Sequence, residues 1–158
     1  MATSKWLKFR PPQKLASYDP HPFQKVFHQD NHKYRAVVSG VGGGKSRMGC
    51  EEVLKWTQLY PGSLGIIGRL TAKSLRETTQ RRFFEVCPVS LIANYNKGEE
   101  HLWIKTNAVG DDGNPIYSEI LFMHLDEPGP LGSLDISYFW IDECHEPEIT
   151  NEIGRAHV

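Results

Sequence analysis

One stretch in the first third of the chain combines flexible glycines with a lysine and a hydroxyl group. Residues 39–46 read Ser-Gly-Val-Gly-Gly-Gly-Lys-Ser, between a β-branched run and a helical pattern. Glycines let successive backbone N–H groups turn inward as an anion cradle, and the following helix adds the positive end of its dipole. The stretch matches the phosphate-loop pattern GxxxxGK[ST], although Ser39 replaces the first glycine. We expect Lys45 to contact the β and γ phosphates of a nucleotide and Ser46 to ligate Mg²⁺. The alternative is a glycine-rich turn without a ligand.

An acidic pair follows the last hydrophobic run. Residues 138–141 predict a buried strand, and Asp142 and Glu143 come directly after it. A carboxylate there can hold hydrated Mg²⁺, and a neighbouring one can accept a proton from attacking water. Alone, the pair would be interpreted as a solvated strand end. Together with the glycine-rich loop it predicts ATP hydrolysis, with Asp142 as Mg²⁺ ligand and Glu143 as general base.

A glutamine precedes the loop by about twenty residues, in Pro20-His21-Pro22-Phe23-Gln24. Its side-chain amide donates and accepts hydrogen bonds at once, which suits the edge of adenine. A helix start with a surface glutamine is an equally good interpretation of Gln24.

Alternating strands and helices must position these groups. After an irregular approach segment at 1–20, the patterns predict a short helix from Phe23, a strand at 34–38 and a helix from Lys45 to Pro61. A strand at 64–68 and a helix capped by Thr71, ending at about Val86, follow. The last predicted elements are strands at 101–105 and 117–124 around a turn at 110–115, and the strand at 138–141. This alternation indicates an α/β fold with a largely parallel sheet and flanking helices.

Composition excludes several classes of protein. The 158 residues carry a net charge of −1, which argues against binding nucleic acid through bulk charge. No apolar run approaches the ~20 residues of a membrane helix. The three cysteines form no CxxC pair, and the start of the chain shows no signal peptide, so we expect an intracellular protein that contacts no membrane.

In this order, the motifs resemble the amino-terminal ATPase domain of a tailed-phage terminase large subunit, the motor that pumps DNA into a preformed capsid. The resemblance covers roughly residues 18–150 and rests on the Pro-His-Pro-Phe-Gln segment, the loop Gly40–Ser46, Gly68-Arg69-Leu70-Thr71 with its helix, the segment from Leu125-Asp126-Glu127-Pro128 to Ser133-Leu134, and Ile141-Asp142-Glu143.

The resemblance implies a P-loop NTPase of the additional-strand (ASCE) class that uses ATP and Mg²⁺. It implies double-stranded DNA, the portal protein and the small terminase subunit as partners, and a homo-oligomeric ring in the host cytoplasm that is not a stable part of the virion. The implied nucleotide-binding residues are Gln24, Gly40, Val41, Gly42, Gly43, Gly44, Lys45, Ser46 and Arg47, with Ser46 and Asp142 on the metal and Lys45 and Glu143 in catalysis.

The chain departs from the family at one residue. Many terminases carry an arginine where Val41 stands. The charge-neutralising arginine is then expected from Arg47, Arg69, another subunit or further sequence. Arg76, Arg81 and Arg82 could contact DNA or a neighbouring subunit's phosphate, but a solvated basic helix face is the simpler interpretation.

Residues 1–152 are interpreted as a partial ATPase domain, incomplete at its carboxyl end. The sheet strand expected after the acidic pair and a nuclease domain are missing. Residues 153–158, Ile-Gly-Arg-Ala-His-Val, are what the sequencing-adapter string ATC-GGA-AGA-GCA-CAC-GTC encodes, so we interpret them as a non-native tail. ATP turnover and DNA translocation are expected of the full-length protein, whereas this chain alone is expected to be poorly soluble and inactive.

Two rival interpretations stay open. A helicase-type P-loop ATPase also uses glutamine, a phosphate loop and an acidic pair, and His145 completes an Asp-Glu-x-His box. The other is a non-functional truncated product. Binding of a nucleotide would distinguish a working domain from a non-functional truncated product.

Overall fold

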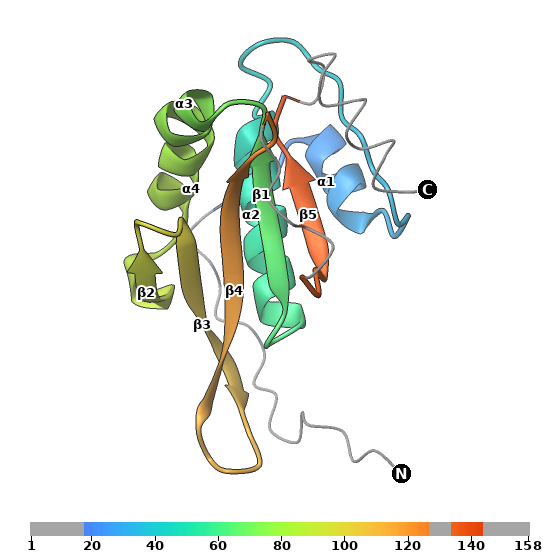
Figure 1. The fold of residues 1–158 in the computed structure, drawn as a ribbon. Helices are drawn as coiled ribbons and strands as arrows, with labels where there is room; N and C mark the ends of the chain where they lie inside the picture. Colours follow the sequence, from blue (N-terminus) through green and yellow to red (C-terminus); the bar gives the residue numbers. More distant parts are fainter. Residues whose placement is uncertain (1–17, 127–133, 144–158) are drawn as a thin grey trace.

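The structure, a computed structural model, describes residues 18–126 and 134–143. Its elements run in the order α1 (Pro22–Gln29), α2 (Lys45–Leu59), β1 (Leu64–Arg69), α3 (Ala72–Ser74), η1 (Leu75–Gln80), α4 (Arg81–Val86), η2 (Val89–Leu91), β2 (Ile92–Asn96), β3 (His101–Val109), β4 (Pro115–His124) and β5 (Tyr138–Ile141) (Figure 1). The segments α3, η1 and α4 follow one another without a break, and η1 is π-helical.

Five strands form one sheet in the order β2-β3-β4-β1-β5. Strand β1 lies at the parallel centre of the sheet, paired with β4 on one side and β5 on the other. Strands β2 and β3 are antiparallel additions at the far side. The prediction of a largely parallel sheet therefore holds for β4, β1 and β5 and is wrong for β2 and β3. The tight turn at Gly110–Pro115 makes β3 and β4 a hairpin, which requires antiparallel strands.

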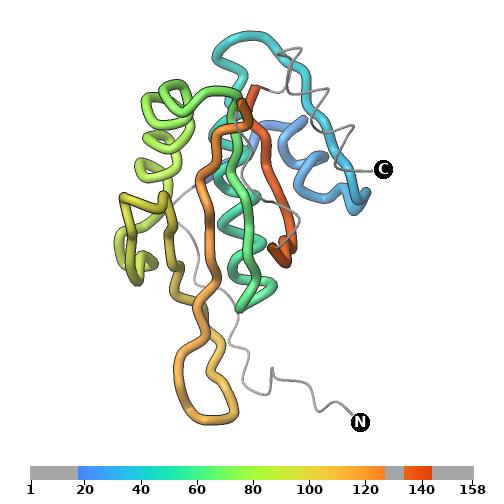
Figure 2. The backbone as a smooth tube through the Cα atoms, in the orientation of Figure 1, coloured from blue at the N-terminus to red at the C-terminus, as the bar shows by residue number. Residues whose placement is uncertain are grey.

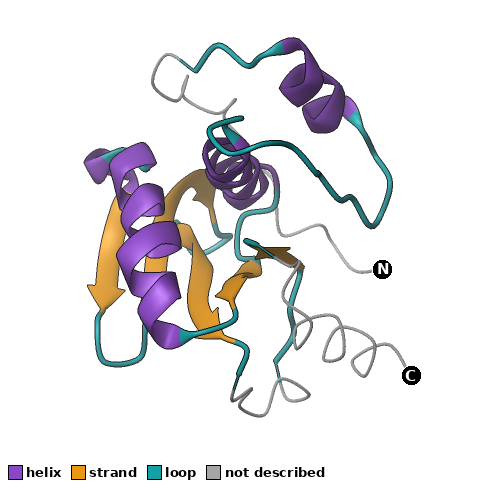
Figure 3. Cartoon of the chain, turned by 90° about the horizontal axis from the view of Figure 1, so that it is seen from above, coloured by secondary structure: helices purple, strands orange, loops and turns teal. Residues whose placement is uncertain are grey.

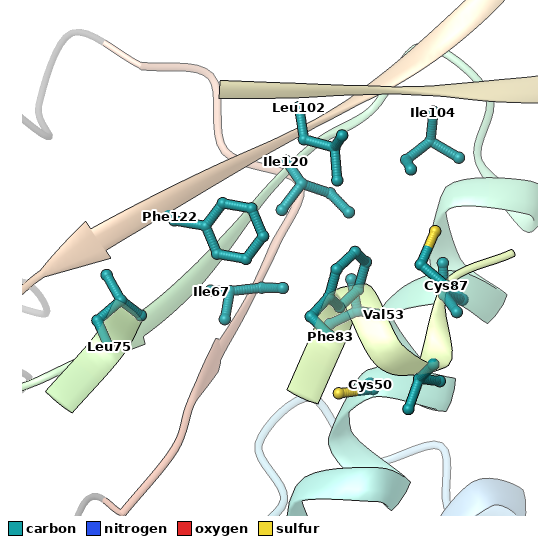
Figure 4. Packing of buried hydrophobic residues seen from close by; sticks show 12 residues of the cluster. Cys50, Val53, Ile67, Leu75, Phe83, Cys87, Leu102, Ile104, Ile120 and Phe122 are labelled. Carbon is teal, nitrogen blue, oxygen red and sulfur yellow. The ribbon is translucent and has the colours of Figure 1, made fainter. Parts of the chain in front are cut away.

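One hydrophobic cluster holds the helices to the sheet. It combines Cys50, Val53 and Leu54 of α2 and Phe83 of α4 with Ile67, Leu102, Ile104, Ile120 and Phe122 of the strands, all at most 4 % exposed (Figure 4). Both helices therefore pack against the same face of the sheet. The sequence predicts a buried stripe of Leu75, Thr79, Phe83 and Phe84 on the helix after Thr71; the first three are buried, and Phe84 is partly buried against the cluster.

The segment before the glycine-rich loop does not form the predicted strand. Residues 34–38 are irregular and run outside the sheet between α1 and α2 (Figures 1 and 3), and Val38 is 99 % exposed. A β-branched run becomes a strand only where a neighbour pairs with its N–H and C=O groups. No strand among the described residues offers such pairing beyond β5, where the sheet ends.

The remaining elements follow the sequence closely. The helices from Pro22 and Lys45 and the strands β1 and β5 lie where the patterns predict them. The predicted strands at 101–105 and 117–124 extend into a long hairpin, visible as the lower projection in Figure 2. Strand β2 was not predicted. In its sequence Ile-Ala-Asn-Tyr-Asn the alanine and both asparagines are exposed, so little hydrophobic alternation marks it.

Candidate functional site

Close packing of α2 on β5 brings the two candidate motifs together. Gly49 of α2 lies against the Trp140 ring so closely that a Cβ atom at this position would overlap the indole. The absent side chain lets the helix approach the strand directly. Ser46 lies one helical turn before Gly49 and Asp142 lies two residues after Trp140, so both come to the same edge of the sheet.

Ser46 and Asp142 meet there although 96 residues separate them. The Ser46 hydroxyl donates to Asp142 Oδ1 at 3.3 Å. Asp142 Oδ2 accepts a second hydrogen bond, at 2.7 Å, from the Thr79 hydroxyl of η1. The backbone N–H of Asp142 donates to the Gly68 carbonyl at 2.9 Å, which fixes the residue at the end of the β1–β5 ladder. Asp142 is 6 % exposed.

The glycine-rich loop crosses this edge just before α2. Gly42 and Gly44 have φ angles of 79° and 76°, a conformation that glycine adopts without steric cost. A Cβ at Gly44 would also lie 2.8 Å from the Gln24 amide nitrogen. These two glycines are therefore required by the loop's conformation, whereas Gly40 borders open space and Val41 is fully exposed.

Lys45 lies folded over its own loop. Its Nζ donates to the Ser39 carbonyl at 2.7 Å, to the Gly40 carbonyl at 3.0 Å and to the Ser39 hydroxyl at 3.3 Å. Ser39, the departure from the phosphate-loop pattern, thus contributes a side-chain acceptor to the lysine.

Gln24 joins α1 to the loop. It is 2 % exposed, its Nε2 donates to the Gly44 carbonyl at 3.1 Å, and its Oε1 accepts from the His21 backbone N–H at 2.8 Å. The interpretation of Gln24 as a surface glutamine is therefore wrong. The contact with adenine stays a prediction, because both ends of the amide are bonded to backbone in this structure.

Arg69 links β1 to the acidic pair. The residue is 8 % exposed, its Nη2 donates to Glu143 Oε2, and its Nη1 lies 3.6 Å from Asp142 Oδ2. Arg47 instead pairs with Glu51 at 2.6 Å and stacks over the Tyr18 ring. Of the two arginines that the sequence offers for charge neutralisation, Arg69 is the one at the acidic pair.

A cavity of about 330 Å³ opens between α2, β5 and the η1–α4 helix, lined in part by Ser46, Arg69, Asp142 and Glu143. Arg81 and Arg82 reach its outer rim, but both pair with Glu85, at 3.2 and 2.9 Å. Arg76 pairs with Glu100 at 2.8 Å. Each arginine of this helix thus has an acidic partner, which supports the simpler interpretation of a solvated basic face.

The donor set at this edge fits a magnesium ion better than a softer metal. Ser46 and Asp142 offer hydroxyl and carboxylate oxygens, the hard ligands that Mg²⁺ prefers. No group of three or more His, Cys, Asp or Glu side chains that could hold a metal occurs among the described residues. Mg²⁺ commonly completes its coordination with phosphate oxygens and water instead.

A second charged cluster fastens α1 to α2 below the loop. Glu52 of α2, 6 % exposed, accepts from His28 Nδ1 at 2.5 Å and pairs with Arg35 at 2.9 Å and Lys55 at 2.7 Å. Burial opposes ionisation of Glu52, but hydrogen bonds from His28, Lys55 and Arg35 outweigh that cost and lower its pKa to about 2. The cluster holds α1, and with it Gln24, next to the loop.

Sequence reasoning missed the threonines of this site. Thr78 and Thr79 both accept hydrogen bonds from Arg69, and Thr79 also reaches Asp142. A polar residue on an otherwise apolar helical stripe was the available signal for Thr79, which the pattern assigned to packing. The segment 127–133, Cys144, His145 and the tail at 153–158 lie outside the described residues.

The fold class is that of an α/β domain in which a glycine-rich loop and an acidic strand end share one edge of the sheet. Among solved structures, the chain is similar to the large terminase ATPase domain of Thermus phage P74-26, with a TM-score of 0.62 and 19 % sequence identity over 88 % of this chain and 62 % of that chain. The resemblance drawn from the sequence is thus confirmed at the level of the fold.

Comparisons of the sequence with family models and curated proteins find no match. No helix among the described residues is both long and apolar enough to cross a membrane.

Proposed function

We propose that this chain is the ATPase domain of a viral DNA-packaging motor, a terminase large subunit, and a P-loop NTPase of the additional-strand class. The observation that carries the proposal is the meeting of Ser46 and Asp142, 3.3 Å apart, beside a glycine-rich loop that ends in Lys45. The fold similarity to a large terminase ATPase domain supports the choice of this class among P-loop proteins.

Each residue then has a role in binding ATP. The backbone of Gly40–Gly44 surrounds the phosphates, Lys45 exchanges its loop carbonyls for phosphate oxygens, and Gln24 contacts adenine. Ser46 and Asp142 hold Mg²⁺, which neutralises phosphate charge when it is bound. Val41 and Arg47 border the same site.

Glu143 acts on the water in the reaction. The water oxygen bonds to the γ phosphorus while the bond from that phosphorus to the β–γ bridging oxygen breaks. ADP leaves with the electron pair of that bond, and Glu143 accepts the proton that the water loses. Asp142 and Arg69 beside it are buried, which strengthens their electrostatic interactions.

In the full-length protein, hydrolysis drives double-stranded DNA into the procapsid. The motor works as a homo-oligomeric ring with the portal protein and the small terminase subunit, in the host cytoplasm. The helicase alternative depends on His145, which the structure does not describe, so nothing here favours it.

Binding of a fluorescent ATP analogue with Mg²⁺ to the purified chain tests the site. Lys45→Ala removes the phosphate contact and is expected to weaken binding about 10-fold or more, the usual effect of losing a charge-assisted hydrogen bond. Lys97→Ala, on an exposed turn, serves as control and should bind like the unmodified chain. Equal affinities for both variants would refute the phosphate-loop assignment, and absence of binding by the unmodified, folded chain would refute nucleotide binding altogether.

A further inference from the structure

Thr79 places a hydroxyl group among the buried apolar residues of the helix after Thr71. It lies four residues after Leu75 and four before Phe83, and all three side chains are at most 2 % exposed. Valine has the shape of threonine and would fill this position without a polar atom. A buried hydroxyl costs free energy unless it is hydrogen-bonded, so its partner identifies what the hydroxyl does.

Two other threonines in the described helices return the hydroxyl proton to their own helix. Thr57 of α2 is also 0 % exposed, and it donates to the Leu54 carbonyl at 2.7 Å. Thr78 donates to the carbonyl four residues before it at 2.5 Å. Bonds to the preceding turn are the common choice for a helical threonine. Thr79 instead donates to Asp142 Oδ2, 63 residues further along the chain, at 2.7 Å.

The neighbours of the Thr79 hydroxyl fix the direction of this hydrogen bond. A guanidinium only donates, and Arg69 Nη1 donates to the Thr79 oxygen at 3.2 Å. A carboxylate only accepts, so the Thr79 proton points to Asp142. The hydroxyl thus has one donor and one acceptor as partners, and neither can exchange its role with the other.

The two oxygens of Asp142 consequently face different groups. Oδ2 accepts from Thr79, whereas the Ser46 hydroxyl lies nearer to Oδ1, at 3.3 Å, than to Oδ2, at 3.5 Å. An aspartate side chain without the contact at Oδ2 could rotate its carboxylate and direct either oxygen to the metal site. With Oδ2 held by the helix, Oδ1 is the oxygen left for a metal ion or for a water bound to it.

The helical segment that carries Thr79 is itself fixed to the sheet. Gln80 donates to the Tyr95 hydroxyl of β2 at 2.7 Å and to Glu100 at 2.6 Å. Arg76 donates to the other Glu100 oxygen at 2.8 Å. A group can orient a metal ligand only if it is held in place by its own neighbours. Thr79 meets this condition.

We propose that Thr79 is a positioning residue for the metal site, because its hydroxyl holds Asp142 Oδ2 and so keeps Oδ1 directed to Ser46 and to the Mg²⁺ of a bound nucleotide. The inference rests on the proposed function, since it concerns the same site. Partners that orient a metal ligand in this way commonly change metal affinity by about 10- to 100-fold.

The first test measures binding of a fluorescent, non-hydrolysable ATP analogue to the full-length protein, once with Mg²⁺ and once with EDTA. Thr79→Val keeps the shape of the side chain and removes the hydroxyl. We expect binding to weaken about 10-fold or more with Mg²⁺ and less than about two-fold with EDTA, because only the metal contact depends on Asp142. Thr79→Ser keeps the hydroxyl and should bind within about three-fold of the unmodified protein in both buffers.

Thr57→Val is the matched control. The same substitution there removes an equally buried helical hydroxyl whose acceptor is a carbonyl of α2. This variant should bind the analogue like the unmodified protein in both buffers. Equal weakening of Thr79→Val with Mg²⁺ and with EDTA would leave Thr79 a structural role only, and full affinity with Mg²⁺ would show that Asp142 does not need the hydroxyl. Either result would overturn the proposal.

The second test observes the hydrogen bond without nucleotide or metal. In solution NMR, a threonine hydroxyl proton gives a signal only when hydrogen bonding and burial slow its exchange with water. We expect such a signal, correlated through bonds with the Thr79 Cβ, in the unmodified protein in EDTA. It should disappear in Asp142→Ala, whereas the Thr57 hydroxyl signal should remain. A missing Thr79 signal beside a visible Thr57 signal in the unmodified protein would refute the contact, and so would its persistence in Asp142→Ala.

The two tests distinguish the two proposals. If the unmodified protein binds no analogue in either buffer, the proposed function fails and the metal role of Thr79 fails with it, while the NMR comparison still decides whether Thr79 holds Asp142. If the analogue binds and Thr79→Val affects binding equally in both buffers, nucleotide binding stands and only the positioning role fails.

Discussion

Ser39 shows how a single residue can depart from a motif without removing its chemistry. The Ser39 hydroxyl accepts a hydrogen bond from Lys45 Nζ at 3.3 Å. The backbone carbonyls of Ser39 and Gly40 accept from the same nitrogen. The glycines with positive φ angles, Gly42 and Gly44, are retained. The backbone conformation of the loop therefore requires glycine near its end, and it does not require glycine at its first position.

Glu143→Gln separates binding from chemistry at the residue scale. Glutamine keeps the size and hydrogen-bonding ability of the side chain but cannot accept the proton of water. We expect ATP affinity of the full-length protein to stay within several-fold, while single-turnover hydrolysis slows by about 10²-fold or more. Parallel losses of binding and hydrolysis would point to a structural role for Glu143 instead.

At the scale of elements, the site depends on how closely α2 approaches β5. Gly49 of α2 lies against the Trp140 ring of β5 and has no room for a Cβ. The backbone of α2 can therefore contact the Trp140 ring of β5 directly. This contact sets the distance between Ser46 and Asp142.

Gly49→Val should force α2 away from β5. Overpacking of this kind costs about 1–3 kcal/mol of unfolding free energy, and we expect nucleotide binding to weaken as Ser46 and Asp142 separate. Gly98→Val, on an exposed turn where a Cβ would lie 3.4 Å from Asn96 Oδ1, is the control. Urea unfolding and analogue binding measure both effects. Similar losses of unfolding free energy and of analogue binding in the two variants would show that the Gly49–Trp140 contact does not determine the geometry of the site.

The Glu52 cluster predicts how α1 responds to pH. The pKa of Glu52 lies at about 2 in the folded chain against an ordinary value of 4.5, so its contribution to stability is complete above 4.5 and is lost as the pH falls toward 2. This pKa shift corresponds to about 3 kcal/mol of unfolding free energy.

Glu52→Gln should therefore lower the unfolding free energy most at neutral pH, and the difference from the unmodified chain should shrink as the pH falls to about 3. Urea unfolding at each pH gives the comparison. Glu99→Gln, on an exposed turn, should stay within about 0.5 kcal/mol at every pH. A Glu52→Gln difference that is constant with pH would mean that the side chain acts through packing and not through its charge.

Much of this arrangement could be predicted from the sequence, because the main motifs are local. Lys45, Ser46, Asp142 and Glu143 were placed by motif and strand end alone, and the structure brings Ser46 and Asp142 together. The Arg69–Thr79 contacts could not be predicted, since they depend on a π-helical turn that no periodicity marks. The failed strand at 34–38 has the same origin, because a strand exists only with a partner that the pattern of one segment does not specify.

At the scale of the whole molecule, one hydrophobic cluster joins α2 and the η1–α4 helix to the sheet. Cys50 and Cys87 lie inside it, at 0 % and 3 % exposure. Burial raises the pKa of both thiols, that of Cys87 to about 12 and that of Cys50 further. Both thiols should react only when the cluster opens.

Thiol labelling therefore reports whether this chain packs as one unit. In a Cys144→Ser background, we expect Cys50 and Cys87 to stay unlabelled in native buffer and to become reactive together along a urea gradient, in step with the loss of helical signal. Rapid labelling without urea would indicate the loosely packed chain that the sequence alone led us to expect. Single-cysteine variants show whether both sites open in one transition.

The π-helical turn of η1 has a consequence for comparing this chain with its relatives. An i→i+5 ladder takes up one residue more than an α-helical turn, so the helix between the Thr71 cap and buried Phe83 contains one surplus position. Deleting that residue would let an uninterrupted α-helix run between the same two anchors. The two threonines would then point in different directions. In an alignment, a one-residue gap at 75–80 would thus mark a relative that keeps the fold but has lost the threonine contacts of Arg69.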